Sequence, residues 1–419
     1  MEDFFLKYKE CKGKLSFNYR GYPLHKIISV ELASIIYGKK VFNYWDITRF
    51  FSSRDVELPV GQEKPFFLYS MGGYGRDDYY SLLNYVREQV PGPLIDLNHN
   101  KKRIKVNLIN IIKAIRFVFS RVDGISFKDK ILISSFFSYL MNYIDTLEKK
   151  RVDMPEAYIA FCSSHMDEGV LDTFFKNKNI RTYTLQHGLY FICDNKNIDM
   201  IAYENIISDR LLCWGEYTKN EFSRYGVPRE QMLVAGYPNE TKKLGKRTLQ
   251  GKPCILVLLS RYTFHANNMK MLKLLSSLKL QDPEIKIDVK MHPSLQINDY
   301  NEIFEKYGFS LCASGTIKSL LESDKYHMTI SYNSTAYYDS YMNNCASLRY
   351  IDEDADDSIN VMDDGFDDEL SLMTKISKVK SEICTEDFWV EVESRLKYIT
   401  GYNINNYKIS ITNTLNNKH

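Results

Sequence analysis

This chain of 419 residues has few of the features that mark secreted, membrane-spanning or metal-bound proteins. Its cysteines form no C-x-x-C pair and no Cys/His spacing typical of zinc; they stand singly at positions 11, 162, 193, 213, 254, 312, 345 and 384. There is no run of 18 or more apolar residues, and the opening MEDFFLKYKECKGK is mixed in charge. We therefore expect no structural metal, no transmembrane helix, no signal peptide, and a cytoplasmic protein with free thiols.

The chain also lacks a strong net charge and internal repeats. Its formal charge is +2, so nothing global indicates a nucleic-acid partner. With 44% hydrophobic and 26% charged residues it has an ordinary globular composition. Its length allows two or three domains with a sizeable core.

Strands and helices alternate along most of the chain. The segment 65–71, PFFLYSM, reads as a buried strand, and a glycine turn at 72–76 leads into a helix. That turn, GGYGR, is either a phosphate-binding loop or simply a tight turn. From residue 156 the alternation is regular, which predicts an α/β fold with parallel sheets wrapped by helices.

A polar, basic stretch divides the chain. The weakly patterned segment 241–252 predicts a linker between a first domain at 1–240 and a second at 253–400. The closing helices of the second domain are candidates to pack back on the first. The Asn-rich tail at 401–419 is expected to be frayed.

Three short motifs carry the chemistry, and each follows a run that reads as a buried parallel strand. They are Gln186-His187-Gly188 after RTYTL, Lys290-Met291-His292-Pro293 after IKIDV, and Ser334-Thr335 with Asp339 after HMTISY. The carboxyl ends of parallel strands line the crevice where open α/β sheets bind ligands. These motifs therefore indicate a ligand site.

The second-domain motifs suit a nucleotide-activated donor. Ser334 and Thr335 offer hydroxyls and backbone N–H groups at a helix start, unless they only cap that helix. Lys290 adds a positive charge, and His292, fixed by Pro293, adds a hydrogen-bond donor. Arg261, after the first strand of this domain, either closes the phosphate pocket or is a surface loop residue.

In the first domain, His187 is our candidate general base. Its imidazole could accept a proton from an attacking hydroxyl, Gly188 permits close approach, and Gln186 could orient the imidazole or the acceptor. Asp167 and Glu168 are a competing pair of carboxylates, unless they only cap the next helix. We favour His187 over that pair.

Residues 101–121, KKRIKVNLINIIKAIRFVFSR, are predicted to form a basic amphipathic helix. Such a helix either lies on an anionic membrane surface or packs its apolar stripe on the core.

Taken together, the motifs resemble those of two-domain GT-B glycosyltransferases that build bacterial surface polysaccharides. The pattern is shared with teichoic-acid glycerophosphotransferases and capsule transferases, over roughly residues 155–350. The matching positions are His187-Gly188, Gly236-Tyr237-Pro238, Lys290 to Pro293, and Ser334, Thr335 and Asp339.

This resemblance implies two Rossmann-like domains that face each other across a cleft. It implies His187 as the base and His292, Ser334 and Thr335 as ligands of the donor phosphates. The expected reaction is transfer of a sugar from a nucleotide-activated donor to a hydroxyl of a growing polysaccharide, by inverting displacement without a metal or cofactor. The expected acceptor is a lipid-linked oligosaccharide or polysaccharide, with the helix at 101–121 held at the inner membrane surface.

Two departures from the family pattern bear on the donor. Leu189-Tyr190-Phe191 follows His-Gly where the glycerophosphotransferases have an extended segment with a lysine, and Ser331-Tyr332-Asn333 precedes the hydroxyl pair where an Asp-Tyr is usual. Both favour a sugar nucleotide over a CDP-glycerol or CDP-ribitol donor.

Several alternatives remain open. The order Asp167-Glu168-Gly169, His-Pro, Ser-Thr also resembles sialyltransferases and keeps a CMP-sugar donor open. A non-catalytic nucleotide-binding or scaffold protein and a nucleotide-sugar epimerase are further alternatives.

Overall fold

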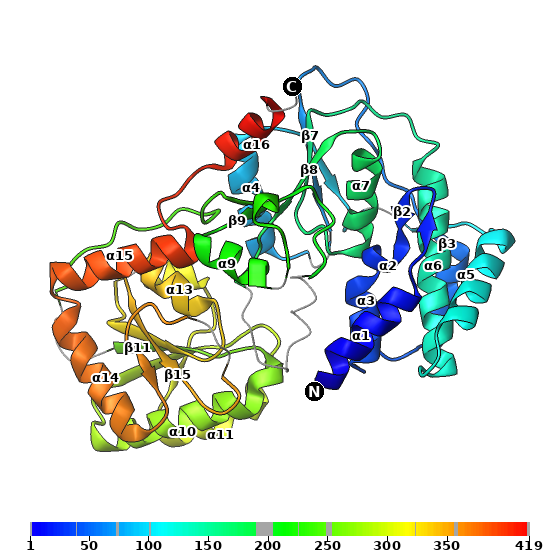
Figure 1. Ribbon diagram of the computed structural model, residues 1–419. Coiled ribbons are helices and arrows are strands. Elements are labelled where there is room, and N and C mark those ends of the chain that lie inside the picture. Colours follow the sequence, from blue (N-terminus) through cyan, green and yellow to red (C-terminus); the bar gives the residue numbers. More distant parts are fainter. Residues whose placement is uncertain are drawn as a thin grey trace. The chain divides into compact units, whose positions relative to one another are not determined.

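The computed structural model describes residues 2–38, 40–72, 75–99, 102–189, 204–224, 226–248, 254–322, 324–355 and 359–416. These residues form two compact units (Figure 1). The first unit comprises 1–190, 195–239 and 405–419, and the second is built from 240–404, as far as they are described. Each contains one six-stranded parallel sheet flanked by helices, so the prediction of an α/β fold with parallel sheets is confirmed.

The sheet of the first unit has the strand order β10-β9-β8-β7-β4-β5. After β4 the chain adds β5 on one side and then β7 on the other, which creates a topological switch point between β4 and β7. The strands are β4 (Phe67–Met71), β5 (Leu94–Asp96), β7 (Ala157–Ala160), β8 (Arg181–Leu185), β9 (Arg210–Cys213) and β10 (Met232–Val234). Helices α4 (Asp77–Gln89), α7 (Met166–Lys176) and α9 (Glu216–Arg224) and the 3-10 helix η2 (Arg229–Gln231) connect them.

A helical part surrounds α6 (Phe127–Leu147), most of whose residues are buried. Against α6 pack α5 (Leu108–Arg121), the 3-10 helix η1 (Tyr44–Phe51) and β3 (Ser52–Arg54). The chain begins with α1 (Glu2–Lys14), a short hairpin of β1 (Asn18–Tyr19) and β2 (Tyr22–Pro23), α2 (Leu24–Ile27) and α3 (Ser29–Ile36).

The helix expected at 101–121 begins later than predicted. Residues 102–104 form β6 (Lys102–Ile104), which pairs antiparallel with β3. The helix starts at Leu108 because the Asn107 side chain accepts hydrogen bonds from the backbone N–H groups of Ile109 and Asn110. Residue 101 lies outside the described residues.

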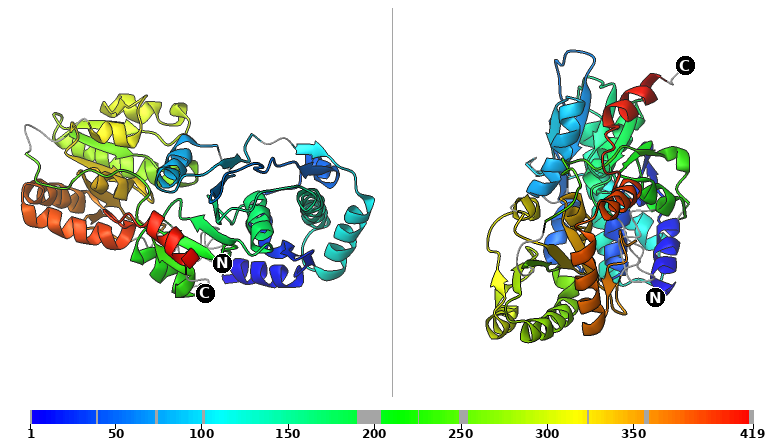
Figure 2. Two further views of the ribbon diagram at one scale, coloured as in Figure 1. Left: turned by 90° about the horizontal axis from the view of Figure 1, so that it is seen from above. Right: turned by 90° about the vertical axis from the view of Figure 1, so that its left-hand side faces the viewer.

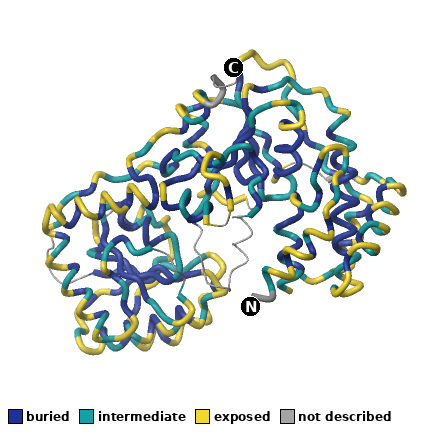
Figure 3. The backbone as a smooth tube through the Cα atoms, in the orientation of Figure 1, coloured by how far each residue is buried: buried dark blue, intermediate teal, exposed yellow. Residues whose placement is uncertain are grey.

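The sheet of the second unit has the order β13-β12-β11-β14-β15-β16, and its switch point lies between β11 and β14. The strands are β11 (Cys254–Leu258), β12 (Lys286–Lys290), β13 (Ser310–Leu311), β14 (Met328–Ser331), β15 (Ala346–Tyr350) and β16 (Gly365–Phe366). The α-helices are α10 (His265–Gln281), α11 (Asn301–Tyr307), α12 (Ile317–Glu322), α13 (Ala336–Met342), α14 (Glu369–Glu382) and α15 (Glu386–Thr400), and the 3-10 helices are η3 (Tyr262–Phe264) and η4 (Ile297–Asp299). Figure 2 shows the sheets and their helices from two further directions, and Figure 3 shows which parts of the backbone are buried.

Both ends of the second unit make contacts within that unit. The closing helices α14 and α15 pack on α10 and α13 of their own unit. The described part of the expected linker, 241–248, has neither helix nor strand and bonds to the second unit; for example, Lys242 N donates to Met342 O at 3.1 Å. Residues 249–252 lie outside the described residues.

The prediction of a frayed tail is wrong for residues 407–416, which form α16 (Tyr407–Asn416) in the first unit. Tyr407 and Ile411 are fully buried in its core. The Tyr407 hydroxyl donates to Gly236 O at 2.7 Å, and the Tyr183 hydroxyl donates to Ile411 O at 3.1 Å. The polar Asn-rich composition concealed these two anchors.

The anchoring of α16 can be tested by a matched pair of substitutions. Ile411→Ala removes a fully buried side chain and should lower the free energy of unfolding by about 2–5 kcal/mol. Ile409→Ala makes the same change at a position that is 56% exposed on the same helix and should cost less than about 0.5 kcal/mol. Equal costs in urea unfolding would show that α16 does not pack as described.

Candidate functional site

The second-unit motifs meet at one edge of the sheet. In the parallel register, Leu258 of β11 lies opposite both Lys290 of β12 and Ser331 of β14. The loops that follow these three neighbouring strands therefore emerge together. They surround the switch point between β11 and β14, where an open α/β sheet binds its ligand.

The buried Ser260, which the sequence analysis did not single out, joins two of these loops. Its hydroxyl donates to the backbone carbonyls of Tyr332 at 2.5 Å and Asn333 at 3.2 Å. The Asn268 side chain bonds both to the N–H and to the carbonyl of Ser260. Asn333 has a φ of +39°, so the chain turns sharply just before Ser334. These bonds fix the backbone that carries the hydroxyl pair.

Ser334 and Thr335 differ in how they use their hydroxyls. Ser334 Oγ accepts a hydrogen bond from Ala336 N at 3.3 Å, which is a capping contact. Thr335 is the N-cap residue of α13, yet its side chain makes no capping hydrogen bond. Both residues are half-buried, and Asp339 lies one turn further along the helix. Helix capping therefore explains the Ser334 hydroxyl, but it does not explain the Thr335 hydroxyl.

His292 is held in one orientation by Ser294. The backbone N–H of Ser294 donates to Nδ1 of His292 at 3.1 Å, and the Ser294 hydroxyl lies 2.9 Å from the same nitrogen. Because Nδ1 accepts a hydrogen bond, the neutral ring carries its hydrogen on Nε2. The same hydroxyl accepts from Tyr262 N at 3.0 Å, which ties this turn to the loop after β11.

Two cations lie at the same edge. Lys290 is the last residue of β12 and is half-buried, and its carbonyl accepts from Leu259 N at 3.0 Å. Arg261 is exposed, and its guanidinium lies over the Phe264 ring at 5.3 Å. Pro293 follows His292 and is exposed. The predicted donor-binding residues thus lie at or just after three adjacent strand ends, except Asp339, which lies within α13.

In the first unit, His187 follows β8 and is half-buried among aromatic rings. Its ring centroid lies 5.3 Å from that of Phe161, 5.7 Å from Tyr79 and 6.3 Å from His165. Burial lowers the pKa of His187 to about 3, and the positive charges of His165 and Arg76 act in the same direction. The imidazole is therefore neutral at pH 7.

The competing carboxylates, Asp167 and Glu168, are engaged inside the unit. Fully buried Glu168 accepts from Ser70 Oγ at 2.8 Å and from the backbone N–H groups of Phe161 at 2.9 Å and Cys162 at 3.3 Å. It joins β4 to the end of β7 at the switch point of this sheet.

Asp167 accepts from the Tyr139 hydroxyl at 2.8 Å and pairs with Arg54 at 2.8 Å. These contacts join α7 to α6 and β3. Neither carboxylate is therefore disposed to take a proton from a ligand.

Gly72 lies against the buried Glu168 carboxylate. A Cβ atom at Gly72 would approach the Glu168 side chain to 3.0–3.3 Å, so a larger residue at this position would require the Glu168 side chain to shift. Residues 73 and 74 of the glycine turn lie outside the described residues, and the phosphate-loop alternative remains a prediction.

A second imidazole, His165, was missed by the sequence analysis. It precedes α7, and its Nδ1 lies 3.7 Å from Glu168 Oε2. Burial disfavours the charged ring, but Glu168, Glu31 and Asp167 outweigh this effect and raise the pKa of His165. The other motifs were identified as polar residues that follow a buried strand. Ser163-Ser164-His165 also meets this criterion, because it follows the buried strand β7.

The two neighbouring imidazoles therefore have pKa values shifted in opposite directions, as is typical of groups with distinct acid and base roles. Ser163 Oγ and Glu31 Oε2 are two of several buried polar atoms that have no hydrogen-bond partner among the described residues. Polar atoms of this kind mark a place where a ligand or water could bind.

Gln186 and Gly236 have supporting roles. Gln186 is 1% exposed; its side chain accepts from Trp214 N at 2.7 Å and donates to Gly188 O at 2.9 Å. It therefore links the ends of β8 and β9. Gly236 has a φ of +102°, which a residue with a side chain rarely adopts.

The described residues contain no group of three or more His, Cys, Asp or Glu side chains placed to hold a metal ion. One cavity in the second unit, of about 610 Å³, is lined by residues from β15 to α15, including Arg349, Glu391 and Arg395. It includes none of the predicted site residues.

No protein-family model and no curated protein matches this chain. Among solved structures, the chain is similar to the S. aureus MnaA–UDP complex, with 12% identity over 84% of this chain and 96% of that one and a TM-score of 0.48. The lipopolysaccharide outer core galactosyltransferase WaaB shows 9% identity over 83% and 98%, with a TM-score of 0.49. A mutant of S. aureus TarM in complex with UDP shows 12% identity over 67% of this chain and a TM-score of 0.44; this chain spans 59% of TarM.

The electrostatics of the histidine pair can be measured by NMR titration of the ring protons. His187 should stay neutral from pH 8 to pH 5, because its pKa is lowered to about 3. His165 should titrate above the usual histidine value of about 6.5. Glu168→Gln removes the nearest negative charge and should lower the His165 pKa. A His187 that titrates between pH 6 and 7 would contradict this description.

Proposed function

We propose that this protein is a glycosyltransferase that moves a sugar from a nucleotide-activated donor to a hydroxyl of a growing cell-surface polysaccharide. The observation that carries the proposal is the set of cations and hydroxyls around the switch point between β11 and β14. A half-buried, neutral imidazole, His187, at the end of β8 in the first unit supports a transfer reaction.

The donor phosphates bind at the strand ends of the second unit. Lys290 and Arg261 supply positive charge, and Nε2–H of His292 and the hydroxyls of Ser334 and Thr335 supply hydrogen bonds. Fixed groups of this kind offset the charge that develops on the leaving phosphate, so this scheme uses no metal or cofactor.

In the transfer step the acceptor hydroxyl gives its proton to His187, and its oxygen attacks the anomeric carbon of the donor. The new C–O bond forms as the bond to the phosphate oxygen breaks, and the nucleotide leaves with the bonding electrons. Direct displacement inverts the anomeric configuration. We prefer His187 to Asp167 and Glu168 because both carboxylates are bound to internal partners.

The acceptor in this proposal is a lipid-linked oligosaccharide or polysaccharide, reached from the cytoplasmic side of the membrane. Among the described residues, no helix combines the length and hydrophobicity needed to cross a bilayer. The enzyme therefore meets its acceptor at the membrane surface in this scheme. CDP-polyol and CMP-sugar donors remain alternatives that a ligand screen separates.

The donor is identified by thermal-shift screening against CMP, CDP, UDP, GDP and their sugars. For the nucleotide that binds, His292→Ala should weaken binding about 10- to 150-fold, the scale of a lost hydrogen bond to a charged group. His99→Ala removes an imidazole that is 83% exposed in the first unit and should leave binding unchanged. Equal affinity of both variants by calorimetry would remove His292 from the donor site.

The role of His187 is tested by His187→Ala, which should reduce turnover about 10²- to 10⁴-fold and leave donor affinity intact. For the native protein, kcat/KM should stay level from pH 8 to about pH 5, because a base with a lowered pKa stays deprotonated there. A loss of rate on acidification that disappears in His165→Ala would assign the base to His165.

If donor binds but is neither transferred nor hydrolysed, the protein is a non-catalytic nucleotide-binding protein. Epimerised sugar in the absence of any acceptor would identify an epimerase instead.

A further inference from the structure

An unusual surface of the first unit exposes large apolar side chains from three neighbouring segments. We call it the outer patch; it consists of Tyr44, Trp45 and Phe51 of η1, Ile104 of β6, Val106, and Leu108, Ile109 and Ile112 of α5. Trp45 is 78% exposed, Ile104 is 89% exposed and Leu108 is 65% exposed. Large apolar side chains in η1, β6 and the start of α5 are therefore exposed to solvent.

The three segments are held side by side by backbone pairing. Ser52, which follows η1, lies opposite Ile104 in the β3–β6 ribbon. Lys105 N donates to Phe51 O at 2.7 Å, so the chain enters α5 next to η1. A cavity of about 540 Å³ lies between the two segments and is lined by Trp45, Phe51, Ile104 and neighbouring residues. The pairing and the cavity thus join η1 to β6, and the exposed residues of α5 follow β6 directly in the chain.

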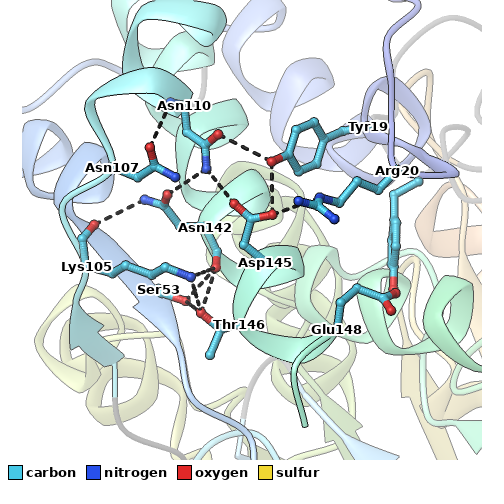
Figure 4. A network of polar contacts seen from close by, with 11 residues as sticks. Tyr19, Arg20, Ser53, Lys105, Asn107, Asn110, Asn142, Asp145, Thr146 and Glu148 are labelled. Atoms are coloured by element: carbon cyan, nitrogen blue, oxygen red, sulfur yellow. Dashed lines mark hydrogen bonds and ion pairs between the residues drawn. The ribbon is translucent and has the colours of Figure 1, made fainter.

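The first turn of α5 presents its polar residue to the core and its aliphatic residues to solvent. Asn110 is 2% exposed, and its side chain donates to Asn142 Oδ1 and Asp145 Oδ2, each at 3.0 Å (Figure 4). The Lys105 ammonium group donates to Asn142 O at 3.0 Å and to Thr146 Oγ1 at 2.7 Å.

Further along α5 the inner side is apolar in the usual way, since Ala114 and Val118 are buried in the core, and only Asn110 departs from the amphipathic pattern. The buried polar network holds α5 in this orientation, so the exposure of Leu108, Ile109 and Ile112 is built into the fold. An exposed apolar surface of this kind marks an interaction site.

The charge of the surrounding sequence identifies the partner. Residues 101–122 contain no Asp or Glu, and their basic residues are Lys101, Lys102, Arg103, Lys105, Lys113, Arg116 and Arg121. Between residues 40 and 54 the one acidic residue, Asp46, is buried and paired with Arg49. A second copy of this chain would place the same basic charge against itself, which is repulsive. An anionic surface that also accepts apolar side chains is complementary.

We propose that the outer patch docks this protein on an anionic lipid bilayer. Trp45, Ile104 and their neighbours insert among the headgroups, and exposed basic residues such as Lys113 and Arg116 contact the anionic lipids. The surface differs from the helix expected at 101–121, because it includes η1 and a strand and excludes the buried side of α5. The docking does not depend on the proposed transferase activity.

Tryptophan fluorescence of the full chain gives a direct test. Of the three tryptophans, Trp214 is 5% exposed and Trp389 is 1% exposed, so Trp45 alone reports on the outer patch. Vesicles of phosphatidylglycerol and phosphatidylcholine should shift the emission to the blue, and pure phosphatidylcholine vesicles should do so much less. Trp45→Phe should abolish the shift. An unchanged spectrum at saturating lipid would overturn the proposal.

Vesicle sedimentation tests the patch with matched variants. Trp45→Ala with Ile104→Ala, and separately Lys113→Glu with Arg116→Glu, should each weaken binding at least about tenfold. Leu280→Ala with Leu370→Ala changes side chains that are 69% and 75% exposed in the second unit and should leave binding unchanged. Circular dichroism confirms that each variant is folded.

Three further outcomes would overturn the proposal: equal vesicle binding by all variants, vesicle binding that does not depend on lipid charge, or a native dimer that the patch variants convert to monomer. Donor affinity of the patch variants, measured without vesicles, should equal that of the native protein. A chain that binds vesicles through the patch but binds no nucleotide would refute the proposed function and leave the docking intact.

Discussion

Parallel strand pairing with a reversal of winding is the constraint on which both candidate sites depend. In each unit the chain adds strands to one side of a starting strand and then returns to the other. The loops at the reversal diverge, and this leaves room for a ligand at the carboxyl edge of the sheet. In the second unit, Ser260 closes the base of this opening by bonding to the loop after β14. The topology of the sheet therefore places the backbone of the proposed phosphate-binding residues at one edge.

At the switch point of the first unit lies a buried carboxylate. This switch point lies between β4 and β7, where Glu168 is buried and bonded to Ser70 and two backbone N–H groups. A buried carboxylate is costly unless it is fully hydrogen-bonded, so these bonds are what allow it to remain there. Its negative charge then acts on the adjacent His165, and the positive charge of His165 contributes to the low pKa of His187. A carboxylate with a structural role thus helps to set the protonation of two imidazoles.

The motifs could be placed at strand ends from the sequence. Which of their side chains form hydrogen bonds or ion pairs with other residues of the chain could not be predicted from it. The strand ends at His187, Lys290 and Ser334 were predictable because buried runs and polar ends alternate regularly. The internal role of Glu168 was not predictable, since its partner Ser70 lies 98 residues away in the chain. The tail was misjudged because the two residues that anchor α16 are surrounded by polar residues rich in asparagine. His165 was available to the same strand-end rule and was overlooked.

The amphipathic pattern of α5 accounts for the buried Ala114 and Val118 but not for the first turns of the helix, where Asn110 is buried and Leu108, Ile109 and Ile112 are exposed. A hydrophobic stripe normally faces the core because burial of apolar area stabilises the fold. Here Asn110 occupies the inward position, and its bonds to Asn142 and Asp145 satisfy polar groups on α6 that would otherwise be buried without these partners. Turning α5 by half a turn would expose the core residues Ala114 and Val118 and would separate Asn110 from Asn142 and Asp145. The rotation of α5 about its axis therefore determines both the buried network and the exposed apolar residues. Folding stability explains why the network is buried, but it does not explain why the apolar residues are exposed.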